Sequence, residues 1–217
     1  MKRILIVAAL AAAIHSASAD TSYLLIQGPF GISGSVDSLK WKVNYHPGQI
    51  TKSSDLLAAV FGSPQSTGTT YTDGFNGTYP IFSAGNNLQG ARYIDFGGGA
   101  YFVIGFTFNG QTAQMNPSYD PGWNAYVAGG GGAQSYPSGA WTYSGDGITT
   151  RTLANGSFDG WVFGATTFQS EAKIANGTTT LAPLAAMFSD ATAINLIPEP
   201  GSALLLLCGA IMLLRRR

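Results

Sequence analysis

Cysteine is almost absent from this 217-residue chain, and the single one, Cys208, lies in an apolar run near the C-terminus. The segment before that run therefore has no disulfide and no thiolate chemistry, so packing must stabilise it. Histidine is nearly as scarce, with His15 and His46 the only two. A zinc or copper site, or a Ser-His-Asp triad, has almost no side chains to draw on. The sequence predicts neither a cofactor nor a metal site.

Charge is also sparse, because only 10% of the residues are Asp, Glu, Lys or Arg. Five of the basic residues lie at the two ends of the chain, and between them six basic side chains stand against eleven acidic ones, a net charge of about −5. Without a basic face, the chain lacks the phosphate contacts that supply most non-specific affinity for nucleic acid. Nucleic acid is therefore not an expected partner.

The middle of the chain has a composition typical of β structure. Glycine is abundant (29 residues) and aromatic residues make up 12% of the chain, which fits apolar strands joined by many turns. Residues 39–45 alternate perfectly, with Leu39, Trp41, Val43 and Tyr45 on one face. Ser53 or Ser54 is expected to cap one short helix near residues 54–61, which Gly62 ends.

Further strands are expected at 23–27, 92–96, 100–108, 123–128, 148–153 and 158–163. Four Asn-Gly pairs, beginning at residues 76, 109, 155 and 176, supply the positive φ angles of type I′ hairpin turns. We expect residues 153–158 to turn one strand directly into the next. The sequence therefore predicts a mainly β, sandwich-like domain with an antiparallel sheet and one short helix, flanked by two apolar terminal helices.

The N-terminus has the pattern of a secretory signal peptide. Lys2 and Arg3 precede an apolar stretch over residues 4–14, and Ala17-Ser18-Ala19 places small residues where signal peptidase requires them. We expect cleavage between Ala19 and Asp20, so that residues 1–19 are removed and 20–196 form one exported β-rich domain.

The C-terminus, residues 197–217, carries a second processing pattern. Pro198 and Pro200 flank Glu199 and favour an extended backbone, which suits a peptidase cleft. Residues 201–214 form an apolar helix of about 21 Å, a marginal transmembrane span against roughly 30 Å of hydrocarbon. Arg215, Arg216 and Arg217 follow it and would stop in the cytoplasm, which places the domain outside the inner membrane.

The order Pro-Glu-Pro, apolar helix and terminal arginine cluster resembles the PEP-CTERM sorting signal. The resemblance covers about the last twenty residues, with Gly201 where another small residue is frequent. It implies recognition by exosortase, a membrane-embedded cysteine peptidase of Gram-negative bacteria, and an association with exopolysaccharide and biofilm matrix. The alternative is a permanent tail anchor.

The exported domain also shows a faint similarity to transcobalamin-like β-grasp domains, over residues 23–129. The similarity rests on Ser54-Asp55-Leu56-Leu57-Ala58-Ala59-Val60-Phe61 and on Gly122-Trp123-Asn124-Ala125-Tyr126-Val127. It implies a small helix packed on one sheet, as an alternative to the sandwich. No ligand contact can be transferred from it to a residue of this chain.

Two sets of residues are candidates for function. Trp123, Trp141 and Trp161 recur in similar settings and could form a sugar-stacking platform, although packing in the core is the simpler interpretation. The acidic residues are scattered and often precede glycine, which favours turns over a glycosidase pair. The glycine runs 97–99 and 129–132 lack a following Lys-Ser/Thr, so we expect loops there rather than phosphate cradles.

The sequence therefore predicts an exported, non-catalytic protein of the cell envelope, surface or extracellular matrix. Its expected partners are signal peptidase, exosortase, the membrane through the C-terminal helix, and exopolysaccharide. A module that binds a glycan or a cobalamin-like molecule is the alternative, and a glycan hydrolase is a third possibility.

Overall fold

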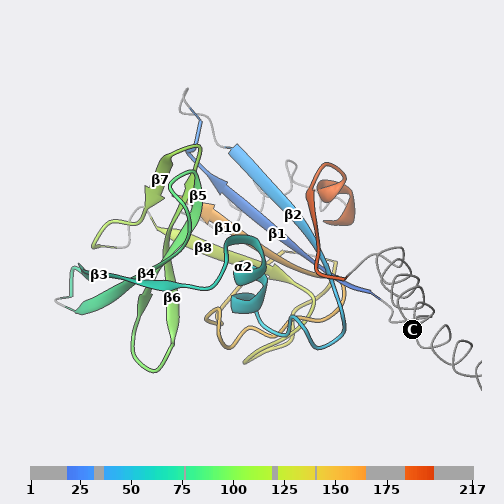
Figure 1. The fold of residues 1–217 in the computed structure, drawn as a ribbon. Coiled ribbons are helices and arrows are strands. Elements are labelled where there is room, and N and C mark those ends of the chain that lie inside the picture. The colour runs from blue at the N-terminus through green and yellow to red at the C-terminus, as the bar shows by residue number, and fades with distance from the viewer. Residues whose placement is uncertain are drawn as a thin grey trace, which may run out of the picture.

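Two β-sheets and one α-helix make up the domain in a computed structural model, which describes residues 19–31, 37–75, 77–118, 122–139, 141–164 and 184–197 (Figure 1). One sheet has six strands, in the spatial order β11 (Thr192–Asn195), β2 (Asp37–Tyr45), β1 (Asp20–Gly28), β10 (Ser157–Phe163), β8 (Trp123–Ala128) and β9 (Thr142–Tyr143). The other has five, in the order β3 (Gln65–Thr72), β4 (Thr78–Gly85), β5 (Gln89–Asp95), β6 (Tyr101–Phe108) and β7 (Gln111–Gln114). The prediction of a mainly β, two-sheet fold is confirmed.

The six-stranded sheet is mixed rather than purely antiparallel. β1 pairs with β10 in parallel, Ser22 opposite Ser157, and β11 pairs in parallel with β2, Thr192 opposite Trp41. The expected hairpin through residues 153–158 is therefore wrong. Residues 148–150 form a turn, and Asn155 uses its side-chain oxygen to accept a hydrogen bond from the Thr21 amide at 2.9 Å.

The five-stranded sheet is an antiparallel meander. Each strand pairs with the next along the chain, from β3 to β7. Asn109 (φ 50°) and Gly110 (φ 77°) form the two-residue connection between β6 and β7, as expected for a type I′ turn.

Gly110→Ala should destabilise the protein by about 1–2 kcal/mol, because a side chain is disfavoured in the left-handed region. Gly139→Ala is the matched control, since a Cβ at that position meets nothing within 4 Å and the residue does not have a positive φ. The control should change stability by less than about 0.5 kcal/mol. Urea midpoints of the two variants measure this, and equal midpoints would contradict the role of the turn.

The main core lies between the two sheets and the helix α2 (Ser53–Phe61). The alternation predicted for residues 39–45 is confirmed, with Trp41, Val43 and Tyr45 buried in this core. The helix adds Leu56, Leu57 and Phe61 to the same core.

The start of α2 is fixed by a carboxylate rather than by a serine. Asp55 Oδ2 accepts hydrogen bonds from the amides of Thr51 (2.9 Å) and Lys52 (3.0 Å). The expected serine cap is therefore wrong. Ser53 belongs to the first turn, and its hydroxyl donates to Asp159 on β10 instead.

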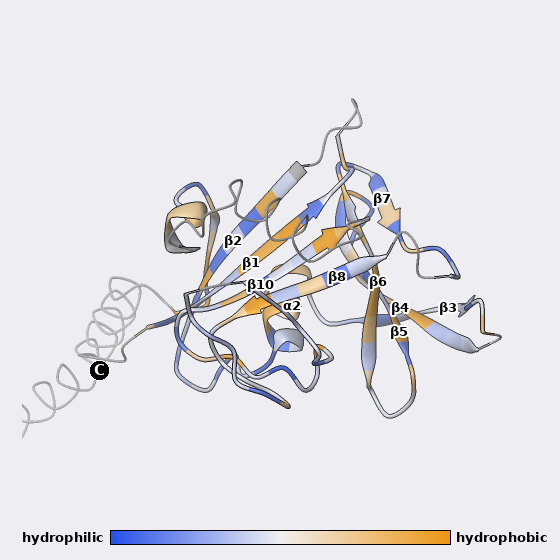
Figure 2. Ribbon diagram, turned by 180° about the vertical axis from the view of Figure 1, so that it is seen from behind, coloured by the Kyte–Doolittle hydropathy of each residue, from blue (hydrophilic) through white to orange (hydrophobic). Residues whose placement is uncertain are grey.

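A second apolar cluster covers the other face of the six-stranded sheet. Its buried members are Leu25, Tyr126, Ala128, Trp141, Phe158, Val162 and Phe188. Phe188 comes from the short helix η1 (Leu184–Phe188). Just after this helix, Asp190 forms an ion pair with Lys40 on β2 at 2.8 Å. Figure 2, viewed from behind, shows the hydrophobic residues along β1 and β10. Because both faces are covered, β10 is buried over nearly its whole length.

The two ends of the described domain meet at one end of the six-stranded sheet. Asp20 opens β1 opposite Tyr45, and Asn195 closes β11 opposite Asn44. The Leu196 amide continues this pairing by donating to the Asn44 carbonyl at 2.9 Å. Within the described part of the chain no helix is long and apolar enough to cross a membrane. Most of the expected signal peptide, the Pro-Glu-Pro motif, the 201–214 helix and the arginine cluster lie outside the described residues.

Candidate functional site

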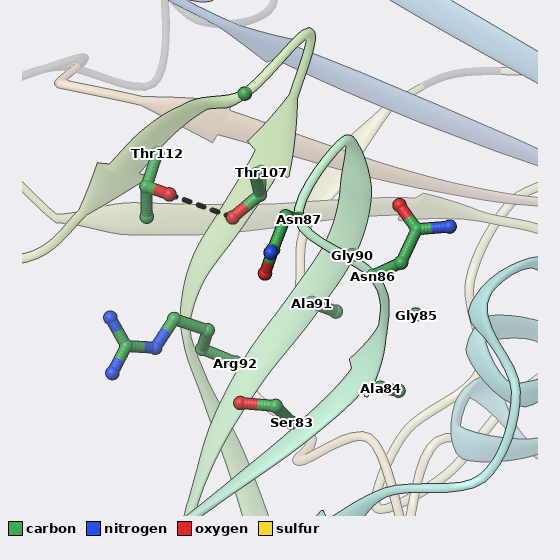
Figure 3. Close-up of a pocket in the computed structure, with 11 residues that line it drawn as sticks. Ser83, Ala84, Gly85, Asn86, Asn87, Gly90, Ala91, Arg92, Thr107 and Thr112 are labelled. Atoms are coloured by element: carbon green, nitrogen blue, oxygen red, sulfur yellow. Dashed lines mark hydrogen bonds between the residues drawn. The ribbon is translucent and has the colours of Figure 1, made fainter.

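A polar groove of about 420 Å³ lies on the outer face of the five-stranded sheet (Figure 3). The hairpin between β4 and β5 and the turn between β6 and β7 frame it. Its lining residues are Ser83, Ala84, Gly85, Asn86, Asn87, Gly90, Ala91, Arg92, Thr107, Gly110 and Thr112.

The register of four strands assembles this groove. Gly85 pairs with Gly90, Gly90 with Thr107, and Thr107 with Thr112, so these residues form one row across β4 to β7. Directly paired residues project from the same face of a sheet. Two of the four positions in the row are glycines, and the backbone of the hairpin between β4 and β5 occupies the space where their side chains would stand.

A second row, two residues further along, supplies the charge. Ser83 pairs with Arg92, so both project from the outer face beside the glycine pair. In the first row, the hydroxyls of Thr107 and Thr112 share a hydrogen bond of 2.8 Å. Figure 3 shows the Arg92 guanidinium extended away from the hairpin rather than folded onto it.

Several polar groups of the groove are unused within the described part of the chain. Arg92 makes no ion pair or hydrogen bond there, and the side chains of Ser83 and Asn87 likewise have no hydrogen bond. The side-chain oxygen Oδ1 of Asn86 accepts from the backbone amides of Leu88 (2.8 Å) and Gln89 (3.0 Å), which leaves the side-chain NH₂ group as a donor. The groove therefore presents both donors and acceptors, one positive charge and no negative charge.

A separate polar cluster is buried between the start of α2 and β10. Arg151 and Asp159 are each 1% exposed. Arg151 Nε donates to Asp159 Oδ1 at 3.2 Å, and Nη2 lies 3.1 Å from the same oxygen. Ser53 donates to the other carboxylate oxygen. Burial raises the pKa of the Asp159 carboxyl, and the Arg151 charge acts in the opposite direction.

This cluster connects two loops, the one between β8 and β9 and the one between β9 and β10. Arg151 Nη1 donates to the carbonyls of Thr152 (2.8 Å) and Gly131 (3.2 Å), and its guanidinium carbon lies 4.9 Å from the ring centre of Tyr136. Tyr136 in turn donates to Asp146 at 2.5 Å. The glycine run 129–132 is thus a loop that packs against the Arg151 guanidinium. A Cβ on Gly130 would lie only 2.7 Å from Arg151 Nη1.

The other acidic side chains within the described ranges mostly stabilise turns. Asp95 Oδ1 accepts the Gly97 amide at 2.7 Å, Asp73 Oδ1 accepts the Gly77 amide at 2.7 Å, and Asp146 Oδ1 accepts the Ala133 amide at 2.7 Å. No three His, Cys, Asp or Glu side chains among the described residues converge on a point where a metal ion could sit. Asp120 and Glu171 lie outside those residues.

The three tryptophans considered as a sugar platform are separated and buried. Trp123 and Trp161 belong to the main core, at 5% and 7% exposed, and Trp141 belongs to the second cluster on the opposite face of the sheet, at 3%. Stacking against a sugar requires an exposed ring, so the geometry favours packing as their role.

Neither Arg92 nor Arg151 was predicted from the sequence as a functional residue. For Arg92 a signal exists: the chain between the two ends has only six basic residues, and Arg92 lies in an apolar run that predicts a strand. For Arg151 there is no local signal, because its partner Asp159 lies across a loop.

Comparisons with known proteins add no family assignment. No family model matches the chain, and no curated protein or solved structure matches it either.

Proposed function

We propose that this chain is an exported, non-catalytic protein of a Gram-negative cell surface or extracellular matrix, sorted by exosortase through its C-terminal tail. The observation that carries the proposal is the sequence of the last twenty residues, with Pro198, Glu199 and Pro200, an apolar segment and a final Arg215-Arg216-Arg217. The signal-peptide pattern before Asp20 supplies the export route.

The position of the two chain ends is consistent with this proposal. Asp20 and Leu196 flank the same end of β2, so the domain begins and ends there. Before cleavage, a domain held by its tail would therefore direct this end toward the membrane. Figure 1 shows the five-stranded sheet on the other side of the domain from β11, drawn in orange-red, so the groove would face away from the membrane.

The chemistry of the site favours binding over catalysis. The carboxylate that is most deeply buried, Asp159, is occupied by Arg151 and Ser53. The groove residues include no carboxylate, so a pair of acids for glycoside hydrolysis is missing from its lining.

A ligand-binding module is the second candidate, and the polar groove favours it. The groove is lined by hydroxyls, amides and one guanidinium. Such a lining suits a hydrophilic ligand. A cobalamin-like molecule would instead favour an apolar pocket.

Replacing Pro198, Glu199 and Pro200 together by alanine tests the sorting role. In the native host the wild-type chain should begin at Asp20 and lack the segment after the motif, whereas the variant should keep its tail and remain in the inner membrane. The extended motif is the part that a peptidase reads, so the expected loss of processing is complete. Mass spectrometry of cell fractions measures both outcomes.

A matched control replaces Pro64, which lies outside the tail, by alanine and should leave processing unchanged. If the wild type and the motif variant both keep the whole tail in the membrane, the tail is a permanent anchor and the proposal is wrong.

A further inference from the structure

We infer that the groove on the five-stranded sheet binds an acidic saccharide, with the Arg92 guanidinium receiving the carboxylate of a uronic acid unit. The inference rests on the proposed function, because a protein placed at the cell surface would meet acidic polysaccharides there. The charge, the size and the polar lining of the groove support it.

Of the basic side chains in the described ranges, two have an ion-pair partner, whereas Arg92, Lys42 and Lys52 have none there. Arg151 and Lys40 are each paired with an aspartate at 3.1 Å and 2.8 Å. Arg92 has no such partner among the described residues, although it is partly buried in a domain with an excess of acidic side chains. A guanidinium matches a carboxylate with two parallel hydrogen bonds. The groove therefore favours a ligand that brings a carboxylate.

The size and the polar lining indicate a saccharide rather than a simple anion. A volume of about 420 Å³ exceeds what a lone inorganic anion fills and falls in the range of small-molecule sites. The hydroxyls of Ser83, Thr107 and Thr112 and the amides of Asn86 and Asn87 offer hydrogen bonds to several ligand hydroxyls. No aromatic ring lines the groove, so a nucleotide base would find no stacking partner there.

Two glycines close the hairpin at one end of the groove. A Cβ on Gly85 would lie 2.2 Å from the Gln89 carbonyl oxygen, and one on Gly90 would lie 2.6 Å from the Ala84 carbonyl oxygen. The hairpin thus requires glycine at both positions.

Calorimetric titration of the full-length protein in detergent tests this inference. The ligands are trimers of galacturonate, glucuronate, mannuronate and guluronate, each compared with its methyl ester, which has no charge. At least one acid trimer should bind, and its methyl ester should bind at least about tenfold more weakly, because the charge-assisted hydrogen bonds are lost.

Arg92→Gln should weaken the binding of that trimer by about tenfold or more, for the same reason. Lys42→Gln on β2 is the matched control, since it removes from the other sheet a partly buried charge that has no ion-pair partner among the described residues, and it should leave binding unchanged. Thermal melting of each variant confirms that it is folded. Inorganic phosphate at the same concentration should not displace the trimer.

The inference is overturned if no acid trimer binds, if Arg92→Gln binds as tightly as the wild type, or if phosphate competes fully, which would identify a simple anion site. These outcomes are independent of tail processing. An unprocessed tail together with binding in the groove would refute the proposed sorting alone, and normal processing without binding would refute this inference alone.

Discussion

Replacing Arg151 by methionine is expected to lower the free energy of unfolding by about 3–5 kcal/mol, which is typical when one partner of a buried ion pair is removed. Asp159 would keep its charge at 1% exposure with only Ser53 as a hydrogen-bond donor. The carbonyls of Gly131 and Thr152 would also lose the guanidinium that they accept from. Urea unfolding at pH 7 measures the loss.

The double variant Arg151→Met, Asp159→Leu is the control, because replacing a whole buried pair by apolar side chains is often nearly neutral. It should recover more than half of the loss. A double variant as unstable as the single one would show that the loops, rather than the unpaired charge, carry the cost.

The pH dependence of the single variant provides a second check. Without Arg151, burial raises the pKa of Asp159 with little to oppose it, above the ordinary value of 3.8. The folded state then holds a proton that the unfolded state has already released, so its stability is greatest at low pH and falls as pH rises through the folded pKa. The deficit relative to the wild type should therefore be smaller at pH 4.5 than at pH 7. A deficit that does not change with pH would contradict the argument.

The parts of the fold that the sequence predicted are those in which local pattern decides. Residues 39–45 alternate because one face of β2 is buried and the other is more exposed, and the largely apolar residues 123–128 form β8 as expected. The helix was predicted because a short apolar run follows two serines and ends at Gly62, whose φ is 90°. In each case the determining contacts lie within a few residues.

The parts that the sequence did not predict depend on distant pairing. The parallel pairing of β1 with β10 joins residues more than 130 positions apart, and no periodicity in either strand reveals it. β3 was missed because Gln65–Thr72 is polar and exposed except at Tyr71, so its strand structure comes from pairing with β4. The Asn155-Gly156 turn was misassigned because the same dipeptide serves any turn that needs a positive φ.

The candidate site illustrates the same limit. None of its members is unusual alone, since Ser83, Asn87 and Thr112 are ordinary residues of strands and turns. They become a site only when the register of β4 to β7 aligns them with Arg92 and with two glycines. The buried cluster is similar, because Asp159 follows a pattern typical of a turn, Asp-Gly, and yet lies in the centre of a strand.

Trp123→Ala is expected to lower the free energy of unfolding by about 3–5 kcal/mol, as for other large aromatic residues removed from a core. The Trp123 ring is 5% exposed and lies 4.7 Å from the ring of Phe106 and 5.0 Å from that of Phe163. Its Nε1 donates to the Ala113 carbonyl on β7 at 3.1 Å, so this side chain links the two sheets. Chemical denaturation at pH 7 measures the loss.

Two controls separate packing from ligand binding. Trp123→Phe keeps an aromatic ring in the core but loses the bond to Ala113, so it should cost less, about 1–2 kcal/mol. Tyr143→Ala removes a ring that is 52% exposed and should change stability by less than about 1 kcal/mol. If Trp123 formed a sugar platform instead, Trp123→Ala would leave stability nearly unchanged while abolishing the binding of neutral as well as acidic saccharides. Because the ring packs in the core between the two sheets, we expect the opposite: unfolding at lower urea concentration, and unchanged trimer affinity in the fraction that remains folded.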